Sequence, residues 1–352
     1  MKPLEGLTVV DASTVLAGPS VGTFLAELGA SVTKFEHPKY GDVTRSWKLK
    51  SESSESTVSA YFSSVNYLKD YKKLDLSSKV GLKLFLDEIR SADILVTNFK
   101  NGDAEKFGID DDTLQGINPR LINAKINGYG EDSDRVAYDL ILQAESGFMS
   151  MNGTPESGPV KMPVAFIDVL AAHHLKEGIL LALYEREKTG KGKSLSTSLY
   201  DAAVCSLVNQ ATNYLMGGHI PERIGSLHPN IAPYGELFET VDNSIITFAI
   251  GSDTHFKKLC RVLELTNLEE DGRFKTNQDR VINRKELFRC INNKIKLLEC
   301  EALLRELEEL NVPAGKVKNL EEVFRDKEAQ NLVRTEVIDG IETKRTTSVA
   351  FK

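Results

Sequence analysis

The sequence lacks long apolar runs and has few cysteines. No apolar run approaches the roughly 20 residues of a membrane-spanning helix, and the first five residues lack the apolar centre of a secretory signal. The 4 cysteines, Cys205, Cys260, Cys290 and Cys300, form no Cys-x-x-Cys pair and no zinc-binding spacing. These absences predict a cytoplasmic protein, away from membranes, with reduced and mostly buried cysteines.

Other signatures are missing as well. There is no G-x-G-x-x-G, which weakens the case for a dinucleotide, and no H-E-x-x-H. His173 and His174 are adjacent, so on a helix they would point about 100° apart, which is unsuitable for a shared metal. The net charge of -7 argues against a general nucleic-acid binder. We therefore expect no metal site and no nucleic-acid partner.

The residues that are present describe an ordinary globular chain. With 352 residues, 41% hydrophobic and 27% charged, it is long enough for two domains. Residues 7–11 read as a buried strand, residues 21–28 as a helix and residues 31–35 as a second strand, with small residues in the first turn. This order is typical of a parallel α/β sheet, so we predict a Rossmann-like large domain.

Further patterns extend this sheet and predict a second domain. We expect strands at 74–76, 93–99, 121–126 and, at an edge, 193–198, with helices at 78–89 and 138–144. A helix from 201 to about 216 would leave the large domain. A hairpin at 235–240 and 244–250, then helices at 254–265, 284–298 and 301–310, predict a smaller α+β unit. The predicted divisions are a large domain (1–200), a linker (201–224), a small domain (225–320) and a C-terminal return segment (321–352), which includes a strand-like region at 335–351.

The chain is organised around Asp168 and the helix that should follow it. Residues 163–167 are mostly apolar, and apolar residues recur at helical spacing behind Asp168, which places this acid at the helix N-cap. Arg186 and Lys188 in the last turn and Gly190 after it predict where the helix ends. Two interpretations of Asp168 stay open on local sequence: a capping residue, or a carboxylate nucleophile at the edge of a cleft.

Polar residues follow several predicted strands, where ligands of open α/β sheets bind. They include Thr14, His37, Asn98 and Asn127. Lys69, Lys72 and Lys73 cluster just before the strand predicted at 74–76, and their plain interpretation is a solvated edge.

A set of short motifs, in collinear order, spans nearly the whole chain. They are Leu16-Ala17-Gly18-Pro19, residues 25–38, Gly41-Asp42 with Arg45, residues 92–99, Gly128-Tyr129-Gly130, Tyr138-Asp139, residues 183–192, and His228-Pro229 with Ala232-Pro233-Tyr234. Together they resemble the signature of the class III CoA-transferases of the CaiB/BaiF type, the group of formyl-CoA transferase and the carnitine CoA-transferases.

The resemblance implies an activity. Asp168 falls on the family's nucleophile, which attacks an acyl-CoA to give an aspartyl anhydride, then an aspartyl-CoA thioester, and so moves CoA to a carboxylic acid acceptor. Acyl-CoA and a small carboxylic acid are the implied substrates, and no metal or permanently bound cofactor is needed. An interlocked homodimer with its site at the interface is also implied. Phe166 and Ile167 could form an apolar wall, and helix dipoles could keep Asp168 ionised.

CoA brings several phosphate charges to an acidic protein, so local positive groups are required. The candidates are His37, Arg45, Lys72, Lys73 and Lys106, with Leu16, Ala17, Asn98 and Phe99 as backbone and walls for adenine and pantetheine. Tyr138, Asp139 and Gln143 are a second tier of site residues, whose alternative role is helix packing.

The same family contains α-methylacyl-CoA racemases, which use a His and an Asp on opposite sides of the α carbon. The residue before Asp139 is Tyr138, so the racemase histidine is missing, and Asp253 fits the transferase pattern. We rank transferase above racemase. A non-catalytic acyl-CoA-binding or nucleotide-binding protein is the rival from another class, and a dehydrogenase is weaker still. No glycine-rich loop supports formyl-CoA and oxalate as substrates, and nothing in the sequence names the donor or acceptor acid.

Overall fold

The computed structural model describes residues 2–351 and divides into two compact units. Unit 1 takes in the chain up to Asn152, Pro159–Glu222, and the chain from Asn331 on; unit 2 takes in Gly153–Gly158 and Arg223–Gln330. Within residues 2–351, no helix is both long enough and apolar enough to cross a membrane.

Unit 1 contains a six-stranded sheet whose strands are all parallel, which confirms the predicted Rossmann-like α/β class. The last strand of this sheet in chain order, β8, pairs at one edge with β5, as its alternating pattern predicts. In sheet order the strands are β3 (Lys69–Lys73), β2 (Ser31–Glu36), β1 (Thr8–Asp11), β4 (Ile94–Thr97), β5 (Ile122–Asn127) and β8 (Ser194–Ser198).

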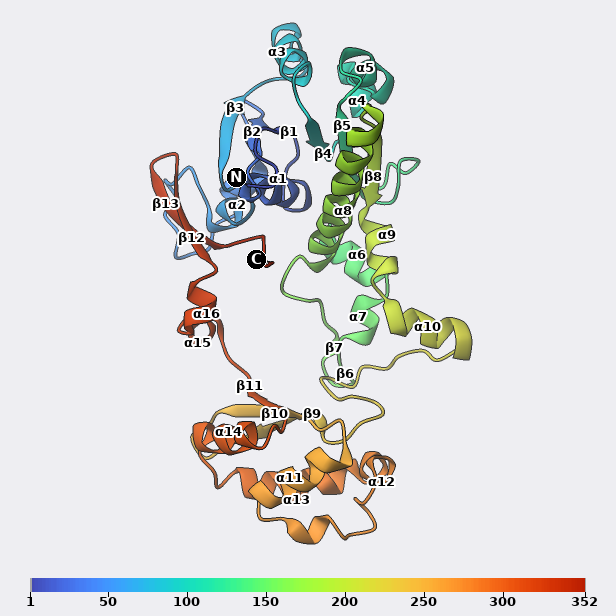
Figure 1. Cartoon of the computed structure of the whole chain (residues 1–352), viewed down its shortest axis with the longest axis vertical. Coiled ribbons are helices and arrows are strands. Elements are labelled where there is room, and N and C mark those ends of the chain that lie inside the picture. The colour runs from blue at the N-terminus through green and yellow to red at the C-terminus, as the bar shows by residue number, and fades with distance from the viewer. Residues whose placement is uncertain (1, 352) are drawn as a thin grey trace. The chain divides into compact units, whose positions relative to one another are not determined.

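Helices cover both faces of this sheet, since alternate strand residues point to opposite sides. On one face, α1 (Ala17–Glu27), α8 (Phe166–Thr189) and α9 (Leu199–Cys205) bury a core that includes Leu25 and Leu175. On the other, α3 (Lys79–Ile89) and α5 (Asp111–Ile117) enclose a second core around Phe85 and Leu114. Figure 1 shows the long α8 beside β8.

The end of α8 was predicted correctly. Gly190 follows the helix with φ 71°, and its N–H bonds to the Arg186 carbonyl. Arg186 itself is buried, and its guanidinium pairs with Asp93 at 3.0 Å and donates to the Arg120 carbonyl. This cation therefore joins the helix end to the start of β4 as well as satisfying the helix dipole.

Three predicted elements of unit 1 differ in the structure: one strand was misplaced, and one helix and one strand-like region are each divided in two. The strand predicted at 74–76 lies earlier, at Lys69–Lys73, so the lysine cluster is itself the edge strand β3. The helix predicted from 201 to 216 is two helices, α9 and α10 (Val208–Gly217), because Val208 takes φ 45° at the break. The strand-like region at 335–351 is a hairpin, β12 (Val333–Ile338) and β13 (Ile341–Thr346), turning at Asp339 and Gly340 with positive φ.

Shorter elements complete unit 1. They are η1 (Val43–Ser46), α2 (Ala60–Val65), α4 (Asp103–Phe107), α6 (Asp139–Glu145) and α7 (Phe148–Met151).

Unit 2 contains the predicted hairpin, β9 (Tyr234–Glu239) and β10 (Ile245–Ala249), with Asn243 at φ 58° in the turn. β11 (Ala314–Lys316) adds a third antiparallel strand. Phe238, Phe248 and Leu259 belong to the hydrophobic core of unit 2.

The helices predicted for unit 2 are present, and one helix that was not predicted, α12, lies among them. The helices are α11 (Asp253–Val262), α12 (Asn277–Ile282), α13 (Arg284–Ile295), α14 (Cys300–Glu309), α15 (Leu320–Val323) and α16 (Lys327–Gln330), with η2 (Thr266–Leu268); two short strands, β6 (Gly153–Thr154) and β7 (Gly158–Pro159), pair separately.

Candidate active site

Asp168 lies in the first turn of α8, two residues after its start, and not at the N-cap as predicted. The N-cap is Ala165, which offers no side-chain acceptor. The capping interpretation therefore does not hold for Asp168, whose side chain is free for another use. The residue is 8% exposed and faces a cavity of about 550 Å³, here called the Asp168 cavity.

The Asp168 cavity is formed at the carboxyl ends of the central strands, where open α/β sheets bind ligands. The loop after β1 contributes residues 14–17, and the segments after β4 and β5 contribute Asn98, Phe99 and Asn127. The sequence candidates that the structure brings together here are Leu16, Ala17, Asn98, Phe99, Lys106, Tyr138, Asp139 and Asp168.

Hydrogen bonds and ion pairs hold the loop after β1 in place. Asn98 donates to the Thr14 carbonyl at 2.8 Å and accepts from Thr14 N at 2.9 Å, so its amide is used within the protein. Val15 has φ 73°, rare for a β-branched residue, and donates its N–H to Asp42 at 3.3 Å. Asp42 in turn pairs with Lys34 at 3.2 Å, and both side chains are fully buried. The cavity wall is therefore supported by a buried ion pair.

The Asp168 carboxyl is in an environment that resists ionisation. Burial, with a further contribution from the charge of Asp139, raises its pKa from 3.8 to about 7. Among residues 2–351, no group donates a hydrogen bond to this carboxyl. Burial and the Asp139 charge therefore act against the ionised state that the helix N-terminus was expected to favour.

Tyr61 of α2 is a neighbour that sequence reasoning missed. Burial, followed by the charges of Asp168, Asp139 and Asp42, raises its pKa to about 12, so its hydroxyl stays protonated. Its ring meets Trp47 edge-on at 5.1 Å between centroids. No local pattern points to Tyr61, since it reaches Asp168 through the fold and lies 107 positions away in the sequence.

Phe166 and Ile167 do not form the cavity wall that was predicted. Ile167 is fully buried in the core, and Phe166 packs against Phe148 at 5.4 Å between ring centroids. Apolar walls come instead from the loop after β1 and from the segment before α6, which includes Val136 and Ala137.

Asp139 and Gln143 of α6 are bonded to the segment that enters α8. Asp139 Oδ1 accepts from Ile167 N at 2.7 Å, and Gln143 Oε1 accepts from Met162 N at 2.8 Å. Gln143 is buried and does not line the cavity, whereas Tyr138, at the N-cap of α6, is exposed at its edge. Figure 1 shows α6 beside the first turns of α8.

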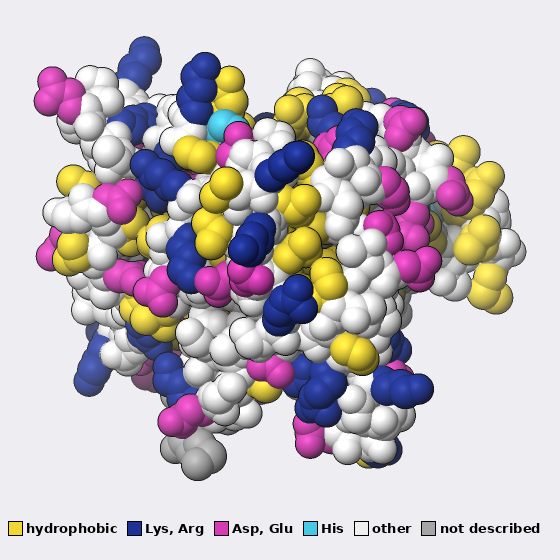
Figure 2. Space-filling view, turned by 90° about the horizontal axis from the view of Figure 1, so that it is seen from above, with side chains coloured by type: hydrophobic (Ala, Val, Ile, Leu, Met, Phe, Trp, Pro, Cys, Tyr) yellow, Lys and Arg dark blue, Asp and Glu magenta, His cyan; other side chains and the backbone are white. Residues whose placement is uncertain are grey.

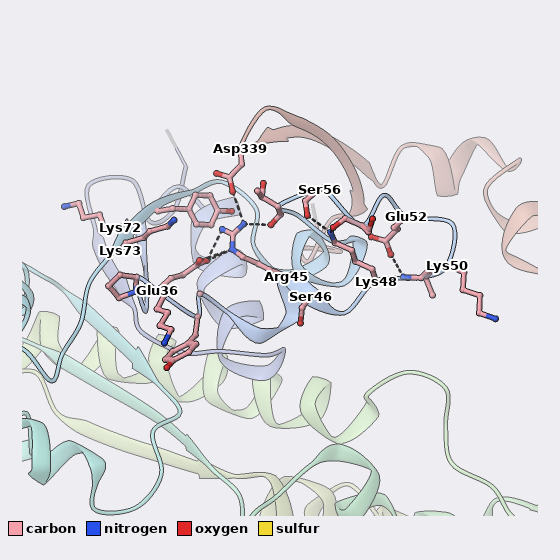
Figure 3. Close-up of a pocket in the computed structure, with 18 residues that line it drawn as sticks. Glu36, Arg45, Ser46, Lys48, Lys50, Glu52, Ser56, Lys72, Lys73 and Asp339 are labelled. Atoms are coloured by element: carbon pink, nitrogen blue, oxygen red, sulfur yellow. Dashed lines mark hydrogen bonds and ion pairs between the residues drawn. The ribbon is translucent and has the colours of Figure 1, made fainter.

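Three of the predicted CoA-binding cations lie elsewhere, around a second cavity of about 1170 Å³ (Figure 3), here called the lysine cavity. Arg45 donates to Glu36 at 2.9 Å and to Asp339 at 2.9 Å, and its guanidinium stacks 3.8 Å from the Phe62 ring centre. Because carboxylates and the Thr57 carbonyl engage Arg45, it joins structural elements and is not poised for a phosphate. Lys72 pairs with Glu88, and Lys73 lines the same cavity.

His37 and Lys106 are also partnered. The His37 ring stacks on Tyr40 at 4.7 Å and accepts the backbone N–H of Lys39 at 3.1 Å. Lys106, at the edge of the Asp168 cavity, pairs with Asp103 at 2.9 Å but is largely exposed. On the face shown in Figure 2, Lys and Arg side chains lie among Asp and Glu side chains.

No group of three or more His, Cys, Asp or Glu side chains in the described part of the chain is arranged to hold a metal ion. The arrangement supplies a desolvated carboxylate, a neighbouring carboxylate, a protonated phenol and a cavity large enough for part of a ligand. These parts suit nucleophilic attack by Asp168 on an acyl group.

Fold and cavity thus define a doubly wound α/β protein with a buried carboxylate at the strand ends. The family model of CoA-transferase family III matches residues 4–350. A succinate–glutarate CoA-transferase of Agrobacterium fabrum is 36% identical over 93% of this chain and 83% of its own length. Human succinyl-CoA:glutarate CoA-transferase is 34% identical over 92% of this chain and 74% of its own length.

A solved structure agrees with these sequence relatives. A CaiB/BaiF family protein of Brucella suis superposes with a TM-score of 0.88 at 35% identity, over 99% of this chain and 93% of that one. The chain belongs to CoA-transferase family III and is a CoA-transferase.

Proposed function

We propose that this chain moves CoA between carboxylic acids through covalent intermediates on Asp168. Asp168 Oδ attacks the acyl-CoA carbonyl, the C–S bond breaks, CoA leaves as thiolate, and an aspartyl-acyl anhydride remains. The thiolate then attacks the aspartyl carbonyl, which releases the donor acid as carboxylate and leaves an aspartyl-CoA thioester. The acceptor carboxylate attacks the carbonyl of this thioester, the C–S bond breaks, CoA leaves again as thiolate, and a second anhydride forms between Asp168 and the acceptor. The thiolate then attacks the acceptor's carbonyl in this anhydride, which gives the acceptor's CoA thioester and frees the Asp168 carboxylate.

The observation that carries this proposal is the state of Asp168. A carboxylate in water is a weak nucleophile because it is strongly solvated, whereas this one is buried and accepts no hydrogen bond from the described residues. A structural carboxylate buried to this degree would be paired with a cation or with donors. Asp168 also faces a cavity, so an acyl group can reach it.

For CoA itself, we propose that the pantetheine arm lies along Leu16, Ala17, Asn98 and Phe99. Lys106 is one of three exposed cations that line the same cavity, together with Lys100 and Arg135. Asn98 would act by fixing the loop after β1, since its amide is bonded to Thr14. CoA is long, and the ends of β2 and β3 are the next along the sheet from β1. A role for His37, Lys72 and Lys73 with the distant phosphates stays a prediction, and Arg45 is better explained as structural.

The relatives named above act on succinate and glutarate, which are both dicarboxylates. We propose dicarboxylic acids of this size as donor and acceptor. We also propose the family's homodimer: α10 buries none of its residues, and Leu215 and Met216 on it are largely exposed, so a second copy is the occupant we expect. Four free cysteines fit a reducing, cytoplasmic location.

The test is to trap the covalent intermediate. Intact-protein mass spectrometry of wild type and Asp168→Ala, mixed with succinyl-CoA or glutaryl-CoA and treated with hydroxylamine, should show an aspartyl hydroxamate at Asp168 in wild type only. No adduct with CoA binding intact would contradict the proposal. Deuterium exchange at the α carbon would then indicate a racemase, and no exchange a silent acyl-CoA binder.

A further inference from the structure

The segment that leads into α8 is exposed, and two side chains of α6 hold it. Residues 161–164 are all exposed, so they have little packing of their own. Met162 N donates to Gln143 Oε1 at 2.8 Å, and Ile167 N donates to Asp139 Oδ1 at 2.7 Å. Gln143 Nε2 donates to Asp139 Oδ2 at 2.7 Å. These three hydrogen bonds, here called the Asp139–Gln143 bridge, fix both ends of the entering segment.

The bridge replaces a missing cap. Ala165 at the N-cap of α8 has no side-chain acceptor, so the orphan N–H of Ile167 is satisfied by Asp139 from a different helix. Ile167 directly precedes Asp168, and its amide therefore fixes the backbone from which the Asp168 side chain projects. The ring of Phe166 against Phe148 fixes the same turn from another side.

We propose that Asp139 and Gln143 are positioning residues, which hold the first turn of α8 so that Asp168 Oδ meets the acyl carbonyl in a reactive geometry. The inference rests on the proposed function, because the exact place of Asp168 affects turnover only if it is the nucleophile. Gln143 separates positioning from direct contact. It is 1% exposed and does not line the cavity, so it acts on the reaction only through the groups it bonds.

The expected effect is on kcat. Displacing a nucleophile by about 1 Å costs on the order of 100-fold in rate. Gln143→Ala removes the acceptor of Met162 N and the donor to Asp139, so kcat should fall by about 10- to 100-fold. The KM for acyl-CoA should change little, because Leu16, Ala17 and Phe99 lie on other segments of the chain.

A rescue experiment tests the hydrogen bonds themselves. Asp139→Asn sets an amide N–H against Gln143 Nε2 and breaks the bridge, so kcat should fall. The double variant Asp139→Asn with Gln143→Glu exchanges amide and carboxylate between the two positions, so all three bonds can re-form, and kcat should return to within a few fold of wild type. A folded double variant as slow as Asp139→Asn would show that the charge at 139 matters and not the bridge, which would overturn the proposal.

Asn118→Ala is the matched control. Asn118 is also a buried amide, donating to the Ile89 and Ala92 carbonyls at 2.9 and 2.8 Å, but it lies away from the cavity. The Asn118→Ala variant should have a lower melting temperature than wild type and the same kcat. If the double variant does not fold, Gln143→Ala decides alone: wild-type kcat, or a change in KM only, would overturn the inference. Absence of a trapped adduct in wild type would instead overturn the proposed function.

Discussion

At the scale of single residues, Asp168 combines reactivity with a stability cost. Its pKa is raised to about 7 because the folded protein disfavours the charged form. The folded state therefore binds this proton more tightly than the unfolded state does. Stability from this group is complete below pH 3.8 and is lost as pH rises from 3.8 to about 7. Above pH 7 the loss is up to about 4 kcal/mol.

Asp168→Asn should consequently be more stable than wild type, and by more at pH 8 than at pH 5. The neutral amide has nearly the same shape and carries no buried charge, so the ionisation cost disappears. Urea denaturation of both proteins at the two pH values measures the difference in the free energy of unfolding. A difference that does not change with pH, or a less stable variant at pH 8, would contradict the assigned ionisation.

Activity should depend on the same proton. Only the carboxylate attacks, so kcat/KM should fall about tenfold per pH unit below about 7 and level off above it. The groups that face Asp168 are Asp139 from α6 and Tyr61 from α2. Asp139→Asn removes the charge of Asp139 while burial persists, so the midpoint should move to lower pH but stay above 3.8.

The midpoint of the pH profile of kcat/KM can be compared whatever the height of the plateau. It is therefore independent of the loss in kcat expected when the Asp139–Gln143 bridge is broken. A midpoint that is the same in wild type and in Asp139→Asn would show that the Asp139 charge does not influence Asp168.

At the scale of secondary-structure elements, local patterns predicted one end of α8 and missed the other. Arg186, Lys188 and Gly190 lie within the last turn or directly after it, so the sequence contains the whole signal for that end. The first turn is capped by Asp139, 28 positions earlier in the chain. A cap supplied by another helix leaves no trace in the local sequence.

The same limit explains β3. Its lysines were interpreted as a solvated cluster beside a strand, because three lysines within five residues are usually exposed. In the fold, the Lys69 side chain is fully buried and pairs with Asp11 of β1 at 2.7 Å, across the sheet from its own edge position. The partner is 58 positions away, so a pattern read along the chain cannot reveal it.

The buried pair of Lys34 and Asp42 should be essential to the loop after β1. Asp42→Ala would leave the buried Lys34 ammonium without the carboxylate it pairs with and remove an acceptor of Val15 N. Breaking a buried pair in this way costs about 3–5 kcal/mol. Glu185→Ala is the control, since Glu185 pairs with Lys193 at a similar distance, 2.7 Å, on the exposed surface; exposed pairs contribute about 1 kcal/mol or less.

Urea unfolding midpoints of the two variants measure this difference. Similar midpoints for Asp42→Ala and Glu185→Ala would mean that the buried ion pair does not stabilise the fold. A large loss for Asp42→Ala, accompanied by weaker acyl-CoA binding, would connect the pair to the cavity wall that it supports.

At the scale of the whole molecule, the sequence was enough to predict the fold class and to place the candidate site at the strand ends. It was not enough to predict which candidate residues line the same cavity. The order of strands and helices along the chain determines which loops meet at one edge of the sheet, so Leu16, Asn98 and Asp168 could be expected together. Which cation faces which cavity depends on side-chain partners. Arg45 is turned to Glu36 and Asp339, and Asp339 belongs to a hairpin almost 300 residues later.

That hairpin lies in the part of the chain from Asn331 on, which belongs to unit 1. At the end of the hairpin and directly after it, the carboxylate of Glu27 bonds to residues within 345–349. Glu27, the last residue of α1, pairs with the Arg345 guanidinium, which is buried over the Tyr67 ring. Its Oε2 also accepts from Thr347 Oγ1 at 2.8 Å, Ser348 N at 2.9 Å and Val349 N at 3.0 Å. Burial acts to raise the pKa of Glu27, but these hydrogen bonds and the Arg345 charge lower it overall.

Glu27→Ala should therefore release residues 345–349 while leaving the sheet folded. Removing the shared acceptor leaves Arg345 without its carboxylate and several donors without a partner, and protease should cut the released segment faster. Hydrogen exchange at Ser348 and Val349 gives the same information at single-residue level. Glu5→Ala is the control, because Glu5 is exposed and its carboxylate accepts, among residues 2–351, a hydrogen bond from the nearby Lys2 N alone. The stabilisation by Glu27 should be present at neutral pH and lost as pH falls through its lowered pKa, so wild type in acid should come to resemble Glu27→Ala. Equal protection of the segment in Glu27→Ala and wild type at neutral pH would show that Val349 packing against the core holds it without the carboxylate.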